Sequence, residues 1–160
     1  MRLAAVLFAV VSSMLLTFTG SASALPSTAR LDSGERAIVR ALNGVRAGHG
    51  LPSLRVSGAL ARAADVHSAN MLANDFFAHG SMGQRVRRYV RSRSIGETLA
   101  RTSSCSRGSA RRVVQMWMNS SGHRAVVLSR RYRKVGVARR AGRLGSARAC
   151  VITADFASRR

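Results

Sequence analysis

The chain has 160 residues, enough for one domain of ordinary size. It carries 27 Lys and Arg residues against 6 Asp and Glu, a formal net charge of +21 at pH 7, and Lys134 is the only lysine. This balance excludes an acidic calcium-binding protein. With 46% apolar residues, 14 glycines and 2 prolines, the chain is not collagen-like, proline-rich or disordered, because it has enough apolar surface to form a core.

The N-terminus has the pattern of a secretory signal peptide over residues 1–24. One positive charge at Arg2 precedes an apolar stretch over 3–18, and small residues with an Ala-x-Ala site follow. We predict cleavage after Ala24, a short linker over 25–33 and a secreted mature protein. An uncleaved membrane anchor is the alternative, because the apolar stretch is only slightly shorter than a bilayer span. No later stretch is apolar enough to cross a membrane.

The first two predicted elements are amphipathic helices. Asp32 and Glu35 have the spacing of a capping box, and apolar residues then recur at helical spacing, which predicts a helix over 34–47. A tight extended connection follows. The second helix is expected to be capped by Ser57 and to run to about Asn74.

The middle of the chain is predicted to alternate short elements with loops. In chain order these are a loop over 75–81, a basic helical turn over 84–90, a strand or turn over 95–100, a loop over 101–109, a helix over 109–119 and a helical turn over 124–129.

The last third of the chain changes from a helical to an extended pattern. β-Branched residues indicate strands over 135–137 and 150–156, and the arginine-rich stretch over 139–147 is predicted to be the loop between them. Asp155, on the last strand, faces either solvent or a cleft. Helices first and strands later in one domain predict the α+β class, with helices packed on a small antiparallel sheet.

Two cysteines, Cys105 and Cys150, are most simply explained as one disulfide, because an exported chain enters an oxidising compartment. Two free buried thiols are the alternative. Cysteines this far apart do not form a metal site by themselves.

Four polar residues are not explained by the apolar pattern: His79, Glu97, Ser120 and His123. Two neutral imidazoles, one carboxylate and an open position for water are the ligand set of many catalytic zinc sites. Histidine also suits acid and base chemistry near neutral pH. The spacing matches no short metal motif such as His-Glu-x-x-His. No Gly-x-Ser-x-Gly elbow surrounds Ser120, which argues against a serine hydrolase.

Other conspicuous side chains have structural explanations that we prefer. His67 lies on an apolar helix face and is expected to be a hydrogen-bonded core residue. His49 follows a helix end and is expected at the surface. Phe76, Phe77 and Trp117 are expected to anchor the core.

Several local signatures, taken in order, resemble a known family. They are Leu42-Asn43-Gly-Val-Arg46, Gly50-Leu-Pro-Ser-Leu54, Ala61 to Met71, Phe77-Ala-His79, Gly96-Glu-Thr98, Trp117-Met-Asn-Ser-Ser-Gly-His-Arg124 and Val135-Gly-Val137. The chain is similar to the bacterial branch of the CAP superfamily, which is named for cysteine-rich secretory proteins, antigen 5 and pathogenesis-related 1 proteins and is also called the SCP domain. We expect this domain over 34–157.

The resemblance implies an α-β-α sandwich with a surface cleft, where zinc or another divalent cation binds in some members. By position, His79 matches the histidine of the family's Phe-x-His segment, Glu97 the acid of its Gly-Glu-Asn segment, and His123 the histidine of its Ser-Pro-Gly-His segment. His79 and His123 are therefore the candidate metal ligands. Glu97 is either a further ligand, an orienting residue beside the metal, or the candidate catalytic residue.

Three positions depart from the family pattern. Thr98 replaces an asparagine, Ser121 replaces a proline before His123, and Ser120 stands where eukaryotic members carry a second glutamate. A pair of carboxylates that acts as acid and base is therefore not supported.

We expect a secreted protein whose cleft binds a divalent metal or a small extracellular ligand, with its catalytic status open. A metal-assisted hydrolase of peptides or envelope polymers is one alternative, with Glu97 activating water. A lipid or sterol carrier is another, although the sequence shows no apolar groove beyond the core faces. The third is a cationic protein that binds anionic cell-envelope polymers or lipids nonspecifically. Specific nucleic-acid recognition is not expected, because the arginines show no pattern for base readout.

Overall fold

The computed structural model describes residues 30–159. The predicted signal peptide and its cleavage site therefore lie outside the described residues. The elements are α1 (Ser33–Gly48), β1 (Arg55–Val56), α2 (Gly58–Ala73), α3 (Met82–Arg87), β2 (Ile95–Thr102), the 3-10 turn η1 (Arg107–Ser109), α4 (Ala110–Asn119), α5 (Ser121–Val127), β3 (Tyr132–Leu144) and β4 (Ala147–Ser158). None of the helices in this part of the chain is long and apolar enough to span a membrane.

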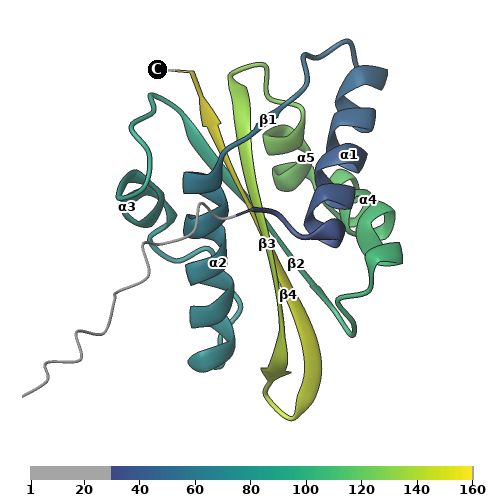
Figure 1. The fold of residues 1–160 in the computed structure, drawn as a ribbon, viewed down its shortest axis with the longest axis vertical. Helices are drawn as coiled ribbons and strands as arrows, with labels where there is room; N and C mark the ends of the chain where they lie inside the picture. The colour runs from purple at the N-terminus through teal and green to yellow at the C-terminus, as the bar shows by residue number, and fades with distance from the viewer. Residues whose placement is uncertain (1–29, 160) are drawn as a thin grey trace, which may run out of the picture.

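These elements form three layers with the sheet in the middle (Figure 1). The four strands lie in the order β1-β3-β4-β2. Helix α2 packs on β3 and β4 from one side with α3 beside it, and α1, α4 and α5 cover the other side. The predicted α+β class and α-β-α sandwich are confirmed.

The sheet differs from the prediction in two respects. β3 and β4 form one long hairpin whose register runs to Leu144 opposite Ala147, so most of the predicted loop over 139–147 is strand. Pairing with β4 satisfies the backbone of this stretch whatever its side chains are, while Arg140 and Arg143 reach solvent. The sheet is also mixed rather than antiparallel, because β1 pairs in parallel with β3 at Lys134 and Val135.

The helix signals in the sequence are mostly confirmed. Asp32 and Glu35 form the capping box of α1, and the side chain of Ser57 caps α2. The region around His123 differs, because α5 begins directly at Ser121 and places His123 in its first turn. The extended backbone of Ser120, with φ −96° and ψ 120°, separates the two helices.

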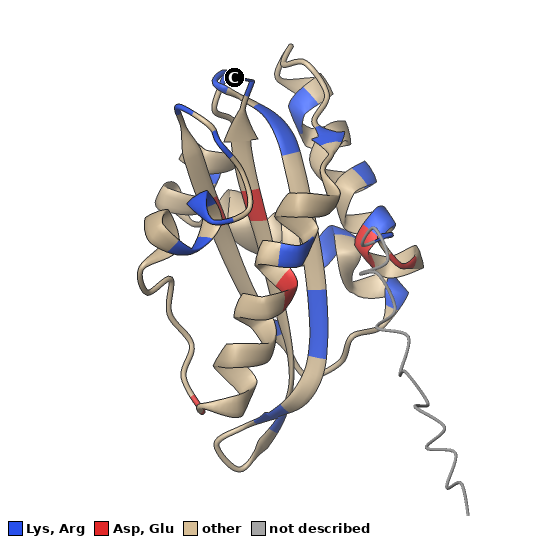
Figure 2. Cartoon of the chain, turned by 60° about the vertical axis from the view of Figure 1, so that its left-hand side comes forward, with Lys and Arg blue, Asp and Glu red and all other residues tan. Residues whose placement is uncertain are grey.

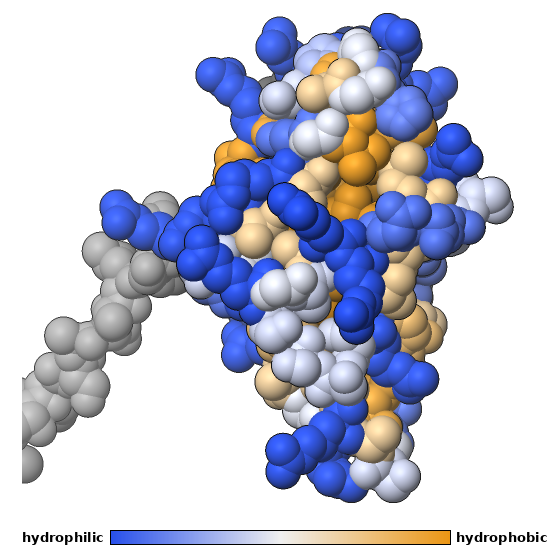
Figure 3. Space-filling model, turned by 90° about the vertical axis from the view of Figure 1, so that its right-hand side faces the viewer, coloured by the Kyte–Doolittle hydropathy of each residue, from blue (hydrophilic) through white to orange (hydrophobic). Residues whose placement is uncertain are grey.

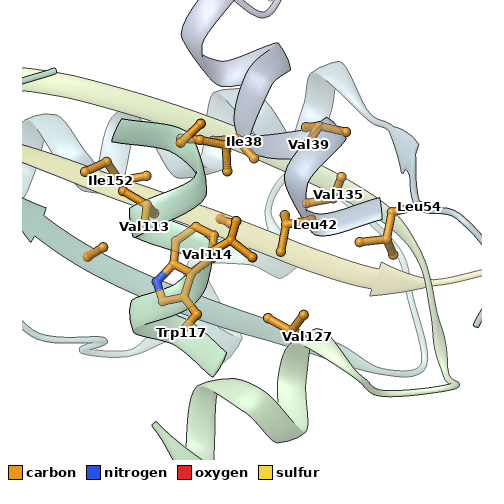
Figure 4. Close-up of a cluster of buried hydrophobic side chains, with 14 of the residues drawn as sticks. Ile38, Val39, Leu42, Leu54, Val113, Val114, Trp117, Val127, Val135 and Ile152 are labelled. Atoms are coloured by element: carbon orange, nitrogen blue, oxygen red, sulfur yellow. The ribbon is translucent and has the colours of Figure 1, made fainter. Parts of the chain in front are cut away.

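The main core lies between the sheet and the layer of α1, α4 and α5 (Figure 4). Trp117 is 1% exposed, and its indole N–H donates to the carbonyl oxygen of Leu99 at 2.9 Å, which confirms it as a core anchor. Phe76 packs beside Met71 on the α2 side. Phe77 is 41% exposed, so its expected core position is wrong. Consecutive side chains in an extended loop point to opposite sides, and only one of these two aromatics faces inward.

Two contacts join distant parts of this core. The disulfide between Cys105 and Cys150 is present and links the segment before α4 to β4.

The second contact is made by Arg46 at the end of α1, which is fully buried. Its guanidinium donates to the carbonyl oxygens of Pro52, Val127, Ser129 and Tyr132 at 2.7–3.3 Å. Burial lowers the pKa of Arg46, and within residues 30–159 no carboxylate pairs with it. Arg46 therefore ties α1 to the segment that connects α5 with β3.

Candidate functional site

The candidate site lies where β2, the loop before α3 and the start of α5 meet. Glu97 on β2 has a fully buried side chain, and its Oε1 lies 2.8 Å from Nδ1 of His79. His79 is half exposed, and its ring centre is 5.6 Å from that of His123, with the ring planes at 58°. The structure therefore brings together the three residues that the sequence analysis selected.

Local backbone constraints place these side chains. Gly80 has φ +54°, a conformation that glycine adopts without strain, and it turns the chain directly after His79. A Cβ atom on Gly96 would lie 2.5 Å from the hydroxyl oxygen of Tyr132, which donates to the carbonyl oxygen of Ile95. The missing side chain at Gly96 thus allows Tyr132 to pack against β2 beside Glu97.

Arg85 joins Glu97 to a second buried carboxylate. Glu97 is in register with Asp155 on β4. Arg85, from α3, donates through Nη2 to Glu97 and through Nη1 to Oδ2 of Asp155 at 3.1 Å. From the sequence, Asp155 was expected to face either solvent or a cleft, and Arg85 was not singled out. Asp155 carried a signal as the only acidic residue of its strand, whereas nothing distinguished Arg85 from the other arginines.

The two carboxylates compete for one cation. Burial raises the pKa of Glu97 to about 7 and that of Asp155 to about 8, and the charge of Arg85 opposes both shifts. One guanidinium cannot balance two carboxylates, so the pair retains a proton at neutral pH. Oδ1 of Asp155 is buried without a hydrogen-bond partner among residues 30–159. Burying an unpaired oxygen costs less free energy in a neutral carboxyl group than in a carboxylate. We therefore assign the proton to Asp155.

The histidines of the site are neutral at the same pH. Burial lowers the pKa of His67 to about 4 and also lowers those of His79 and His123. His67 is 4% exposed and hydrogen-bonds through Nε2 to the carbonyl oxygen of Ala78 at 3.0 Å, which confirms it as a core histidine. Since His79 donates from Nδ1 to Glu97, its Nε2 keeps the lone pair that a metal ion or a ligand proton requires.

The cluster supplies two imidazoles and no third protein ligand. Across the described part of the chain, no group of three or more His, Cys, Asp or Glu side chains is placed to hold a metal ion. Two imidazoles on one tetrahedral zinc ion have ring centres roughly 5 Å apart, close to the observed spacing. Glu97 is already bound by His79 and Arg85, so it is placed to orient His79. A closed structural metal site takes four protein ligands, so these two imidazoles do not form one.

Ser120, His49 and Thr98 were also singled out from the sequence. Ser120 is at the junction of α4 and α5, where its side chain makes no capping hydrogen bond. His49 is exposed at the end of α1, as predicted. The Thr98 hydroxyl, at the position of the family's asparagine, is buried without a partner within the described residues.

A separate groove runs between α1 and α4, on the face that Figure 3 shows. It has a volume of about 1000 Å³. Its floor is apolar and is formed by Ala37, Ala41, Val45 and Val114. Its rim is basic and is formed by Arg40, Arg107 and Arg111. Its apolar residues belong to the faces of α1 and α4 that the sequence assigned to the core, and the structure leaves part of these faces open as a groove. Small residues on α1 leave this space, which a sequence pattern does not distinguish from a packed helix face.

Comparison with known proteins places these features in one family. The family model described as "CAP: Cysteine-rich secretory protein family" matches residues 39–153. The chain is 32% identical over 111 residues to the uncharacterized membrane protein YlbC of Bacillus subtilis (strain 168), which covers 66% of this chain and 31% of that protein. It is 26% identical over 125 residues to the uncharacterized protein YkwD of the same organism, with coverages of 74% and 46%. The chain thus spans about a third to a half of the length of these curated relatives.

Solved structures share the fold. An outer surface protein from Borrelia burgdorferi has a TM-score of 0.67 at 20% identity, and the match covers 81% of this chain and 97% of that protein. An extracellular protein containing an SCP domain from Bacillus anthracis str. Ames has a TM-score of 0.63 at 27% identity, with coverages of 79% and 40%. Venom allergen-like protein 4 of Schistosoma mansoni reaches 0.61 at 16% identity, with coverages of 80% and 90%.

Proposed function

Because the chain belongs to the cysteine-rich secretory protein (CAP) family, we propose that it is an exported domain in which His79 and His123 bind a divalent cation such as zinc. The observation that carries this proposal is the 2.8 Å contact between His79 Nδ1 and Glu97, beside the ring of His123. A carboxylate that accepts from one ring nitrogen fixes the other for metal binding. When bound, the cation would act as a Lewis acid toward an extracellular ligand.

Export is supported by three observations. The first 24 residues have the pattern of a signal peptide, and Cys105 and Cys150 form a disulfide, which persists in oxidising compartments. Two structural neighbours are described as an outer surface protein and an extracellular protein.

A binding role is favoured over hydrolysis by the state of the carboxylates. Glu97 is held by His79 and Arg85, and Asp155 is buried and carries the shared proton. Ser120 stands where eukaryotic members of the family carry a second glutamate. Within residues 30–159, this cluster therefore offers no unpaired carboxylate to activate water.

Zinc titration by calorimetry tests the cation site on the oxidised protein that begins at Leu25. We expect saturable one-to-one binding that is lost in the His79→Ala, His123→Ala double variant. The matched control is His49→Ala, which removes an exposed imidazole outside the site and should leave binding unchanged. Equal binding by the wild type and the double variant would refute the proposal.

The role of Glu97 is tested separately by Glu97→Gln. If Glu97 orients His79, the variant should bind zinc about ten-fold or more weakly and still saturate at one ion. An unchanged affinity would show that the hydrogen bond to His79 does not support cation binding.

The groove between α1 and α4 supports a second function, the binding of an anionic amphiphile. Its volume lies at the upper end of small-molecule sites, and its apolar floor and three rim arginines match a hydrocarbon chain with an acidic head group. Ala41→Phe should reduce the uptake of a fluorescent fatty acid because it fills the groove. Ala47→Phe, at an exposed position of the same helix outside the groove, is the control. Equal uptake by both variants would exclude the groove as the site.

The surface charge supports a further, nonspecific interaction with anionic envelope polymers. Lys and Arg residues lie on helices, strands and loops alike in the view of Figure 2. The surface carboxylates of Asp32 and Asp65 are already paired with Arg139 and Arg140. We expect adsorption to such polymers that falls steeply with added salt and is equal in the His79→Ala, His123→Ala variant. Adsorption that resists salt would contradict this mechanism.

A further inference from the structure

A second hollow, between α2 and α3, includes His79 but not His123. Its volume of about 360 Å³ is in the range of small-molecule pockets. Val66, His67 and Asn70 come from α2. Arg85 comes from α3, and Arg88 directly follows that helix. The pocket is thus built on two helices that the sheet holds in place.

The pocket has one uncompensated positive charge. No carboxylate lines it. Arg85 points inward to Glu97 and Asp155, which offset its charge. Arg88 is exposed, and it takes part in none of the ion pairs formed within residues 30–159. A single free guanidinium matches a ligand with a single negative charge, and a carboxylate can bind it through two parallel hydrogen bonds.

Apolar side chains stand beside that charge. Phe76 and Tyr89 line the pocket and are half-buried, and Val66 is 47% exposed at its wall. Phe77, next along the same loop, is 41% exposed. Val66 and Phe77 are two of only four large apolar residues that are exposed in the described part of the chain. Apolar surface grouped with polar side chains marks a binding site more often than scattered exposure does.

A buried polar atom is also available in the wall. His67 lines the pocket although it is 4% exposed, and its Nε2 is used by the carbonyl oxygen of Ala78. In the neutral ring Nδ1 is then an acceptor. It makes no hydrogen bond within residues 30–159, so it can accept one from a ligand N–H.

We propose that this pocket binds a small monocarboxylate that carries an aromatic or branched apolar group, the chemistry of a peptide's C-terminal residue. Arg88 pairs with the carboxylate, Val66, Phe76 and Tyr89 contact the apolar group, and His67 accepts from the amide N–H. His79 lines both this pocket and the cation site, but no contact with His123 or with a metal enters the assignment.

The test compares N-acetyl-L-phenylalanine with its C-terminal amide, by calorimetry on the oxidised protein with a chelator present. We expect saturable binding of the acid and at least about ten-fold weaker binding of the amide, because a charged hydrogen bond is lost. 3-Phenylpropionate has the carboxylate and ring without the amide, and should bind more weakly than N-acetyl-L-phenylalanine. Equal binding of these two acids would refute the peptide assignment.

Variants locate the site. Arg88→Gln should weaken binding of the acid about ten-fold, whereas Arg91→Gln, which removes a nearby exposed charge outside the pocket, should not. Val66→Glu should abolish binding, with an unchanged circular dichroism spectrum because Val66 is exposed. Equal losses in both arginine variants, equal affinity for acid and amide, or no saturable binding of any probe would overturn the proposal. Because a chelator removes zinc from these experiments, none of their outcomes bears on the result of the zinc titration.

Discussion

Replacing Arg46 by methionine tests how much one buried cation contributes to this fold. Arg46 is fully buried and donates to four backbone carbonyl oxygens from three segments. Methionine preserves much of the side-chain length but leaves those carbonyl groups without their donor. Each hydrogen bond to a charged group contributes about 1.5–3 kcal/mol, and relief of the buried charge offsets part of the loss.

The expected net loss is therefore about 3–5 kcal/mol, a large fraction of the roughly 5–15 kcal/mol that stabilises a typical domain. It corresponds to a fall in Tm of roughly 10–15 °C for a domain of this size. Urea and thermal denaturation followed by circular dichroism, with the disulfide intact, measure both quantities. Arg40→Met is the matched control, an exposed arginine on the same helix, and should change stability by less than about 0.5 kcal/mol.

The reasoning would be refuted if the two variants had free energies of unfolding within about 1 kcal/mol of each other. That result would mean that water or a rearranged backbone satisfies the four carbonyl groups as well as the guanidinium does.

Three further predictions concern the sheet. Replacing both Cys105 and Cys150 by alanine removes a cross-link between residues that are 45 apart in the chain. The free energy of unfolding in urea titrations should fall by about 4 kcal/mol, because the unfolded chain gains conformational entropy. A loss below about 1 kcal/mol would contradict this chain-entropy estimate. Gly136→Ala places a Cβ 2.0 Å from the backbone nitrogen of Ala61, so thermal denaturation should show a loss of at least about 2 kcal/mol, and a wild-type Tm would show that α2 can shift. The pKa of Asp155 is raised from 3.8 to about 8, so the native state holds a proton that the unfolded chain releases above about pH 4. The free energy of unfolding of the wild type should therefore fall by at least about 1.4 kcal/mol relative to that of Asp155→Asn as the pH rises from 4 to 8. A difference between the two free energies that stays constant with pH would refute the shared-proton assignment.

Local signals were sufficient for much of the fold. The capping box of Asp32 and Glu35 and the cap at Ser57 predicted where α1 and α2 begin, because a cap depends on residues within one turn. The arginine-rich stretch over 139–147 was misread as a loop. Its strand conformation depends on pairing with β4, and that pairing is not encoded in the stretch itself.

The candidate site was predicted in part for the same reason. His79, Glu97 and His123 were selected from short motifs, and the structure brings them together. Arg85 was missed and the side that Asp155 faces was left open, because their pairing depends on a strand register and a helix position that join residues 70 apart in the chain.

The sequence by itself determined the family and the α+β class and pointed to His79, Glu97 and His123, because these follow from short motifs and from periodic patterns. Tertiary structure alone decided the protonation of the buried carboxylates, the burial of Arg46 and the two hollows beside the helices. Charge, burial and empty space depend on which surfaces meet when the layers pack, and a linear pattern of residues does not contain that information.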